Sequence, residues 1–290
     1  MAWPSARWRT RRRLNPAACG SSRSCHPLAL ESGLAAGAAR ALAESERAAL
    51  ACTRGVVVTS PATAGSLAAY GVAGDRIAVV PPGTPDLDLS PGTRGWTPVR
   101  SELSLALLSV ATLTPRKGHD TLIAALAPLA GLGWRLTCAG SLTMHPPTAG
   151  AARDALIRHG LADRVTFTGD LDDAALAAAY RRADVFVLPT RHEGYGMVVA
   201  EAVAAGLPVV ATPTGAIPDL VDESNGVLVP IDDVPALTAA LQRIIGDDGY
   251  RLALAEGARR RRARLPRWRD AAARMADALS HFSAHGILHR

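Results

Sequence analysis

Two carboxylates flank a glycine-containing loop and the first turns of a predicted helix. Glu193 and Glu201 are separated by seven residues, and Glu201 is the only charged residue of the helix predicted over 197–205. A carboxylate on an otherwise apolar helix needs hydrogen-bond donors, because burying it without them is costly. Gly194 and Gly196 leave the backbone N–H groups at the helix start open to an anion such as a diphosphate. The two carboxylates together therefore predict a ligand site.

Each charged residue also has a plain structural explanation. Glu193 could offset the helix dipole, and Glu201 could pair with a buried arginine. For Glu193 alone we favour that explanation, but two carboxylates around one glycine loop favour a ligand. Arg116 and Lys117 could belong to a solvated helix start. Their place in a loop after a predicted strand instead favours phosphate binding, with Gly118 allowing close backbone approach.

Short apolar strands alternate with helices from residue 105 onward, which is typical of a parallel, doubly wound α/β sheet of the Rossmann-like kind. The predicted strands span residues 105–110, 135–139, 165–168, 185–188, 209–211 and 226–229. Helices are predicted near residues 120–129, 148–159, 173–182, 197–205 and 234–245. Ligands bind such sheets outside the carboxyl ends of the strands. The loops 111–118, 189–196 and 212–218 should therefore converge on one crevice.

The first part of the chain carries fewer elements. A long helix is predicted from residue 28 to about 53, with a short buried strand at 56–58 and another strand at 77–80. Ser60 before Pro61 predicts a helix N-terminus with a serine cap.

Three segments differ in composition from these elements. Residues 81–98 have the proline and glycine content of a linker. A last helix is predicted over 270–282. Residues 1–25 match no motif and are predicted to be a disordered or non-native N-terminus, as would follow from a wrong start site or a shifted reading frame.

Composition allows a sizeable hydrophobic core. The chain has 290 residues, 48% of them hydrophobic, with a mean hydropathy of +0.11 and no apolar run long enough for a transmembrane helix. The four cysteines lack the paired CxxC spacing of a zinc site or a disulfide framework. Reduced thiols in a cytoplasmic protein are the simpler interpretation.

The formal net charge of +6 is concentrated in two arginine clusters, one near the start of the chain and one at 259–269. Such clusters can bind nucleic acid or anionic lipid. No nucleic-acid motif or aromatic stacking platform accompanies them, so we predict solvated faces and no nucleic-acid partner. Peripheral contact with a membrane stays open as an alternative.

The loop around the two glutamates resembles the signature of the family 4 retaining glycosyltransferases, which have the GT-B fold. Three further stretches match that family in order and spacing, and they span residues 114–120, 183–190 and 206–212. Upstream, residues 26–31 and 77–84 resemble the end of that family's N-terminal domain. The resemblance covers about residues 26–285.

The resemblance implies a role for each site residue. Lys117, with help from Arg116, would hold the diphosphate of a UDP- or GDP-sugar. Glu193 would accept hydrogen bonds from hydroxyls of the donor sugar, and Glu201 would bind the ribose hydroxyls. A carboxylate can accept from two vicinal hydroxyls at once, which explains the residue type at both positions. Sugar and phosphate would also contact the loop and helix start formed by Gly194, Tyr195, Gly196, Met197 and Val198.

Lys117 and Glu193 are the predicted catalytic residues. Stabilising the departing diphosphate is the main electrostatic task of such a transfer, because the transition state expels negative charge. A cation and a helix N-terminus can do this without a metal. No Asp-x-Asp pair lies in a suitable loop, so no metal or other cofactor is predicted.

The resemblance also implies a division of the chain. Residues 26–92 would be a remnant of the acceptor-binding N-terminal domain, 93–265 the nucleotide-sugar-binding domain, and 266–290 a crossing helix and tail. The family's N-terminal glycine loop has no counterpart in this sequence. Thr112 stands where many relatives carry an arginine, so phosphate binding would depend more on Lys117.

The sequence therefore predicts a glycosyltransferase that moves a sugar, with retention, from a nucleoside diphosphate to an unknown lipid, glycan or small-molecule acceptor. The alternative is a truncated, non-catalytic fragment that still binds the nucleotide, and sugar transfer by this chain is expected to be very weak or absent. A GT-B epimerase would need N-terminal acids that the sequence lacks. A Rossmann oxidoreductase is disfavoured because no G-x-G-x-x-G follows a first strand.

Overall fold

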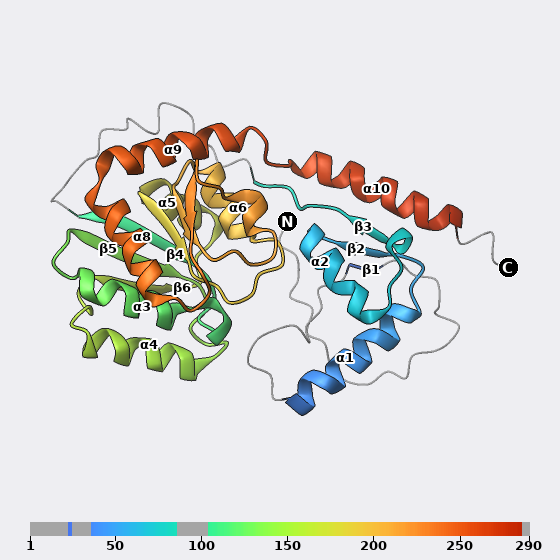
Figure 1. The fold of residues 1–290 in the computed structure, drawn as a ribbon, viewed down its shortest axis with the longest axis horizontal. Helices are drawn as coiled ribbons and strands as arrows, with labels where there is room; N and C mark the ends of the chain where they lie inside the picture. Colours follow the sequence, from blue (N-terminus) through green and yellow to red (C-terminus); the bar gives the residue numbers. More distant parts are fainter. Residues whose placement is uncertain (1–22, 25–35, 86–103, 286–290) are drawn as a thin grey trace.

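The computed structural model describes residues 23–24, 36–85 and 104–285. These residues form two parallel β-sheets, a small one near the start of the chain and a larger one that is covered by helices (Figure 1). A long C-terminal helix runs from the larger unit along the smaller one (Figure 1).

The larger sheet has six parallel strands, with the spatial order β6-β5-β4-β7-β8-β9. Its strands are β4 (Leu105–Val110), β5 (Trp134–Ala139), β6 (Val165–Gly169), β7 (Val185–Leu188), β8 (Val209–Ala211) and β9 (Gly226–Leu228). Counted within this sheet, the order is 3-2-1-4-5-6, which is that of a doubly wound Rossmann fold. The predicted fold class is confirmed.

Helices cover both faces of this sheet, and the strands are apolar on both faces as a result. Successive side chains of a strand point to opposite faces, so Leu107 and Val187 pack into one hydrophobic core while Leu108 and Phe186 pack into another. The helices are α3 (His119–Leu126), α4 (Pro146–Arg158), α5 (Asp173–Arg182), α6 (Met197–Ala204), α7 (Ile217–Leu220), α8 (Val234–Gly246) and α9 (Asp248–Arg262). Helix α3 contributes to the core that contains Leu107, and α6 to the core that contains Leu108.

The predicted elements agree closely with this part of the structure. Strands β4, β7 and β8 and helix α5 begin and end at the predicted residues, and the other predicted elements of the larger unit differ at their ends by a few residues. Helix α9 was not predicted. Its buried residues are Arg251, Leu254 and three small residues, and a Cβ at one of these, Gly257, would lie 1.7 Å from the carbonyl oxygen of Ser224. A buried face with one leucine and one arginine among small residues has little hydrophobic periodicity to detect.

The small sheet has the order β1-β2-β3, with β1 (Arg23–Ser24), β2 (Val56–Val58) and β3 (Ile77–Val79) all parallel. The predicted serine cap is confirmed, because the Ser60 side chain accepts a hydrogen bond from the Thr63 N–H at 3.1 Å at the start of α2 (Pro61–Ser66). The short 3-10 helices η3 (Leu67–Tyr70) and η4 (Gly74–Arg76) connect α2 to β3.

Two sequence predictions meet the described residues only in part. Strand β1 falls within the segment 1–25 that was predicted to be disordered, and its parallel pairing with β2 corrects that prediction at these two residues. The long helix predicted from residue 28 is α1 (Ala36–Ala51), while residues 28–35 lie outside the described part of the chain, as does the linker beyond residue 85.

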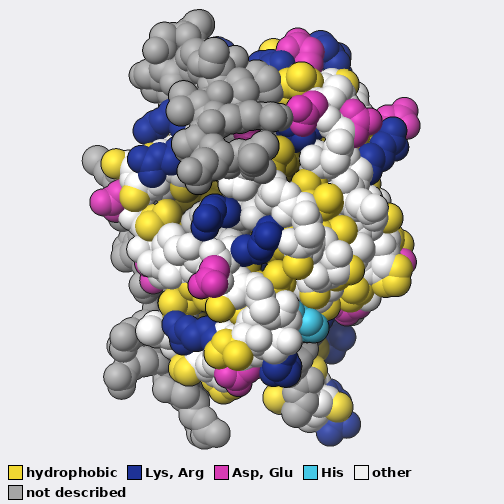
Figure 2. All heavy atoms as spheres, turned by 90° about the vertical axis from the view of Figure 1, so that its left-hand side faces the viewer, with side chains coloured by type: hydrophobic (Ala, Val, Ile, Leu, Met, Phe, Trp, Pro, Cys, Tyr) yellow, Lys and Arg dark blue, Asp and Glu magenta, His cyan; other side chains and the backbone are white. Residues whose placement is uncertain are grey.

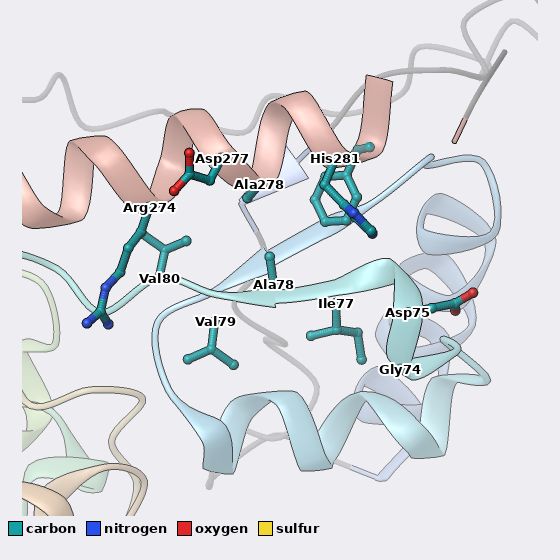
Figure 3. A pocket seen from close by; sticks show the side chains of 11 residues that line it. Gly74, Asp75, Ile77, Ala78, Val79, Val80, Arg274, Asp277, Ala278 and His281 are labelled. Carbon is teal, nitrogen blue, oxygen red and sulfur yellow. The ribbon is translucent and has the colours of Figure 1, made fainter. Parts of the chain in front are cut away.

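Helix α10 (Trp268–His285) joins the two units. Its Phe282 and Ala278 pack against Val57 and Val80 of the small unit. Just before the helix, the Pro266 carbonyl accepts a hydrogen bond from the Thr84 N–H at 2.8 Å. An open pocket of about 470 Å³ lies between β3 and α10, and Figure 3 shows the side chains that line it.

Charged side chains are dispersed over the described part of one face of the larger unit. Seen from that side, Lys and Arg lie scattered among acidic and apolar residues over the described part of the face (Figure 2). In the second arginine cluster, Arg259 pairs with Glu256 at 2.7 Å and Arg261 with Asp222 at 2.5 Å. This arrangement suits solvated helix faces. No helix among the described residues is long and apolar enough to cross a membrane.

The close approach of α10 to the small sheet predicts the effect of a methyl group at Gly55. A Cβ there would lie 2.3 Å from the Phe282 ring. We expect Gly55→Ala to destabilise the fold by about 1–3 kcal/mol, because the ring must move out of its packed position. Gly65→Ala is the control, since a Cβ at this position in α2 would meet no atom within 4 Å. It should leave stability unchanged or raise it by about 0.5–1 kcal/mol. Denaturant unfolding measures both variants. A Gly55→Ala protein as stable as wild type would contradict the packing of α10 against the small sheet.

Candidate functional site

The topology of the larger sheet creates a crevice between the carboxyl ends of β4 and β7. The chain leaves β4 toward α3 on one face and leaves β7 toward α6 on the other, so the two loops diverge at this point. Open α/β sheets bind ligands at such a switch point. The loops concerned are 111–118 and 189–196.

Lys117 and Glu193 meet across this crevice. The Lys117 Nζ donates to Glu193 Oε2 at 2.5 Å, and Arg116 Nη1 lies 3.8 Å from the same oxygen. The side chains of Lys117 and Glu193 are only 9% and 15% exposed, so the pair is largely withdrawn from water. Charges in such surroundings interact more strongly than they do on an open surface. The structure thus brings together three of the residues that the sequence singled out.

Main-chain contacts hold the two loops side by side. The carbonyl oxygen of Arg116 accepts from the Arg191 N–H at 2.7 Å and from the Thr190 hydroxyl at 3.1 Å. The Arg116 guanidinium in turn donates to the His192 carbonyl at 3.1 Å. Gly118 has a φ of +70°, and a Cβ there would lie 2.0 Å from the Pro189 carbonyl oxygen. Only glycine allows the backbones to come this close.

The loop after β8 packs against the loop after β7. Ala216 N–H donates to the Gly194 carbonyl at 3.1 Å. Gly215 has a φ of +56°, and a Cβ at this position would lie 1.9 Å from the Glu193 carbonyl oxygen. The hydroxyl of Thr212 donates to the backbone of the β7 loop. The predicted convergence of three loops on one place is therefore confirmed.

Helix α6 begins directly after the loop that carries Glu193. Gly196 caps it in a left-handed conformation with a φ of +85°, and the helix begins at Met197. The first N–H groups, including that of Val198, have no acceptor within the helix and carry the positive end of its dipole. Tyr195 is buried just before the helix, and burial, followed by the charge of Asp219, raises the pKa of its hydroxyl. An N-terminus beside Lys117 and Arg116 can hold an anion.

Glu201 lies in the next turns of α6 and is held by a tyrosine. The Tyr180 hydroxyl of α5 donates to Glu201 Oε2 at 2.8 Å, so the suggested buried arginine partner is replaced by a phenol. Burial raises the pKa of Glu201, the Tyr180 hydrogen bond lowers it, and the charge of Asp173 raises it. Burial also raises the pKa of Tyr180 well above its usual value. Tyr180 was not identified from the sequence. The only indication there is a tyrosine, which has a polar hydroxyl, within an alanine-rich helix.

His119 was also missed as part of this neighbourhood. It is 2% exposed at the start of α3, and neither ring nitrogen has a hydrogen-bond partner among the described residues. Burial lowers its pKa to about 4, with opposing effects from Asp120, which raises it, and Lys117, which lowers it. The imidazole is therefore neutral near pH 7. Within the described part of the chain, no group of three or more His, Cys, Asp or Glu residues is placed to bind a metal ion.

Comparison with known proteins agrees with this geometry. The sequence profile of the family Glycosyl transferases group 1 matches residues 104–247, which contain all three loops. A solved sucrose-phosphate synthase from Thermosynechococcus elongatus is 30% identical, with a TM-score of 0.78, over 91% of this chain and 68% of that one. The chain belongs to the group 1 glycosyltransferases.

Two further proteins show how much of the chain and of its relatives the similarity covers. A D-inositol 3-phosphate glycosyltransferase from Xylanimonas cellulosilytica is 38% identical over 220 residues, covering 72% of this chain and 52% of that protein. The chain spans about half the length of the curated relatives it matches. Anabaena HepE, solved in complex with UDP and glucose, is 23% identical with a TM-score of 0.73 and has the same fold. The family match therefore covers the six-stranded sheet and the three loops at the carboxyl ends of its strands.

The buried setting of Glu201 predicts opposite effects of Glu201→Gln on binding and on stability. A raised pKa in the folded state means that ionisation opposes folding, and stability is lost as pH rises through the raised pKa. Glutamine cannot ionise, and it keeps an oxygen for Tyr180. We expect an unchanged or higher melting temperature at pH 7, with UDP or GDP binding weaker by on the order of 1.5–3 kcal/mol. Calorimetric titration that finds equal affinities would remove Glu201 from the site.

His119 predicts a specific pH dependence of stability. Because its pKa is lower in the folded state, about 4 against 6.5, the unfolded chain takes up the proton first as pH falls. Stability is therefore lost between these two values. His119→Leu should remove this loss, so that wild type loses about 2 kcal/mol more than the variant between pH 7.5 and pH 5. Urea unfolding of both proteins at the two pH values is the measurement, and parallel curves would contradict it.

Proposed function

We propose that this chain binds a UDP- or GDP-sugar in the crevice between β4 and β7 and transfers the sugar, with retention, to a hydroxyl of an acceptor. The observation that carries the proposal is the contact of Lys117 with Glu193 beside the N-terminus of α6. It brings cationic groups together with a carboxylate that would accept hydrogen bonds from sugar hydroxyls. The proposal of family 4, and of retention with it, is supported by the resemblance of the Glu193–Glu201 loop to the signature of that family.

The charges of the site support diphosphate binding. Lys117 and Arg116 supply cations, and the α6 N-terminus adds the partial charge of its unsatisfied N–H groups. Departure of a nucleoside diphosphate moves negative charge onto these phosphates in the transition state. Groups that are fixed before the reaction stabilise this charge without having to reorganise. Lys117 would act there as a catalytic residue.

The two glutamates support recognition of hydroxyl groups. Glu193 is held by Lys117, and its remaining lone pairs would accept from the donor sugar. Glu201 has Oε2 engaged by Tyr180, so that its remaining lone pairs would accept from vicinal ribose hydroxyls. HepE, which has the same fold, was solved with UDP and with glucose, and this agrees with the proposed donor class.

Nucleotide release tests the proposed transfer. The chain is incubated with UDP-glucose, UDP-N-acetylglucosamine or GDP-mannose and with lipid, glycan and polyol-phosphate acceptors. The last group includes D-inositol 3-phosphate, which the names of several relatives suggest. We expect weak but acceptor-dependent release, which Lys117→Ala should abolish. Nucleotide binding with no release for any acceptor would favour the alternative, a nucleotide-binding protein without transferase activity, and absence of both would refute the proposal.

The charge arrangement also predicts that nucleotide binding is independent of divalent metal. Lys117, Arg116 and the α6 N-terminus are proposed to neutralise the diphosphate without an ion. Titration with UDP and GDP should give the same dissociation constant in EDTA as in excess magnesium. If EDTA abolished binding and magnesium restored it, the assignment of the diphosphate to these groups would be wrong.

A further inference from the structure

Arg191 lies two residues before Glu193 and is the centre of a polar network. Its Nε donates to both carboxylate oxygens of Asp232, at 2.8 and 3.0 Å. Its Nη1 and Nη2 donate to the carboxylate of Asp120, at 3.1 and 2.8 Å. Nη1 also donates to the Pro115 carbonyl, and Nη2 to the Thr121 hydroxyl at 3.3 Å. One guanidinium therefore binds four neighbours.

These contacts use all the donors of the side chain. A guanidinium has five N–H groups, and here Nε serves Asp232, Nη1 serves Pro115 and Asp120, and Nη2 serves Asp120 and Thr121. Two carboxylates also balance the single positive charge twice over. Arg191 thus has no N–H left for a donor phosphate, which separates its role from that of Lys117 and Arg116.

Three of the four partners come from the segments around the Lys117 loop. Pro115 begins the 3-10 helix η5 (Pro115–Lys117), whose last residue is the lysine of the site. Asp120 and Thr121 are in the first turn of α3, directly after this loop. The side chain therefore connects its own loop, which carries Glu193, to residues on both sides of Lys117.

The remaining partner, Asp232, connects the network to the segment that follows the edge strand β9. Asp232 lies in the turn between β9 and α8. Among the residues that the structure describes, it is the only non-glycine residue with a positive φ, which is +57°. Aspartate adopts this left-handed conformation more readily than most residues, but such a backbone persists only where its surroundings hold it. The Thr121 hydroxyl donates to the same carboxylate at 3.1 Å and closes the ring of contacts.

We propose that Arg191 is a positioning residue of the donor site, which sets the separation of Lys117 from Glu193 by fixing the two loops that carry them. The inference rests on the proposed function for its effect on binding. The planar guanidinium serves two carboxylates and a carbonyl at once, a geometry that a lysine ammonium cannot reproduce. Arg191→Gln and Arg191→Lys should both release the loops, although lysine keeps the charge.

Hydrogen exchange tests the positioning without any ligand. In Arg191→Gln and Arg191→Lys, peptides covering 111–118 and 189–196 should exchange faster than in wild type. The matched control is Arg251→Gln in α9, which loses an ion pair to Asp248 at 2.6 Å and a hydrogen bond to the Ile244 carbonyl at 3.1 Å. The control should lower overall stability and leave these peptides unchanged. Wild-type exchange in both Arg191 variants would overturn the proposal.

Nucleotide affinity supplies the second measurement, with UDP and GDP as the probes. At a temperature where every variant is folded, the Arg191 variants should bind the better probe about tenfold more weakly or worse, since small displacements of binding groups are costly. The Arg251→Gln control should bind as wild type does. Full affinity in Arg191→Lys would refute the requirement for a guanidinium. If wild type bound neither probe, the proposed function would fail, and hydrogen exchange would still decide the positioning.

Discussion

The contact between Lys117 and Glu193 is the interaction on which the rest of this site depends. It joins two loops from neighbouring strands at the point where the sheet reverses its winding, and it does so with side chains that are mostly shielded from water. Opposite charges in such a place attract each other strongly, but each has also lost much of its hydration. The arrangement is favourable only where backbone and side chains fix the geometry. A bound nucleotide sugar that contacts both side chains would supply further hydrogen-bond partners.

Several features of the chain serve that geometry. Gly118 and Gly215 allow backbones to approach at distances that any Cβ would prevent. Arg191 connects the loops that carry Lys117 and Glu193 through its hydrogen bonds to Pro115 and Asp120. Other features oppose stability. Glu201 is a carboxylate whose pKa is raised by burial, and His119 is a buried imidazole without a partner among the described residues. Buried polar groups of this kind gather at functional sites, where function is maintained at some expense of stability.

The sequence predicted the features that depend on local pattern. The apolar runs of β7 and β8 and the Ser60 cap were placed at the right residues, because strand burial and capping leave their signal within a few positions. Helix α9 was not predicted because Leu254 is the only large apolar side chain on its buried face. The Tyr180 contact with Glu201 and the Arg191 network escaped because they join residues far apart in the chain, which side-chain type alone does not pair.

The central claim is that the crevice between β4 and β7 is a nucleoside diphosphate site, and a crystal structure of the chain with UDP tests it most directly. The account predicts the diphosphate within hydrogen-bond distance of Lys117 Nζ and of the first N–H groups of α6, with the ribose hydroxyls on Glu201. Glu193 should then lie free of the phosphates and open toward the sugar position. UDP bound elsewhere, with the Lys117–Glu193 contact undisturbed, would contradict the account.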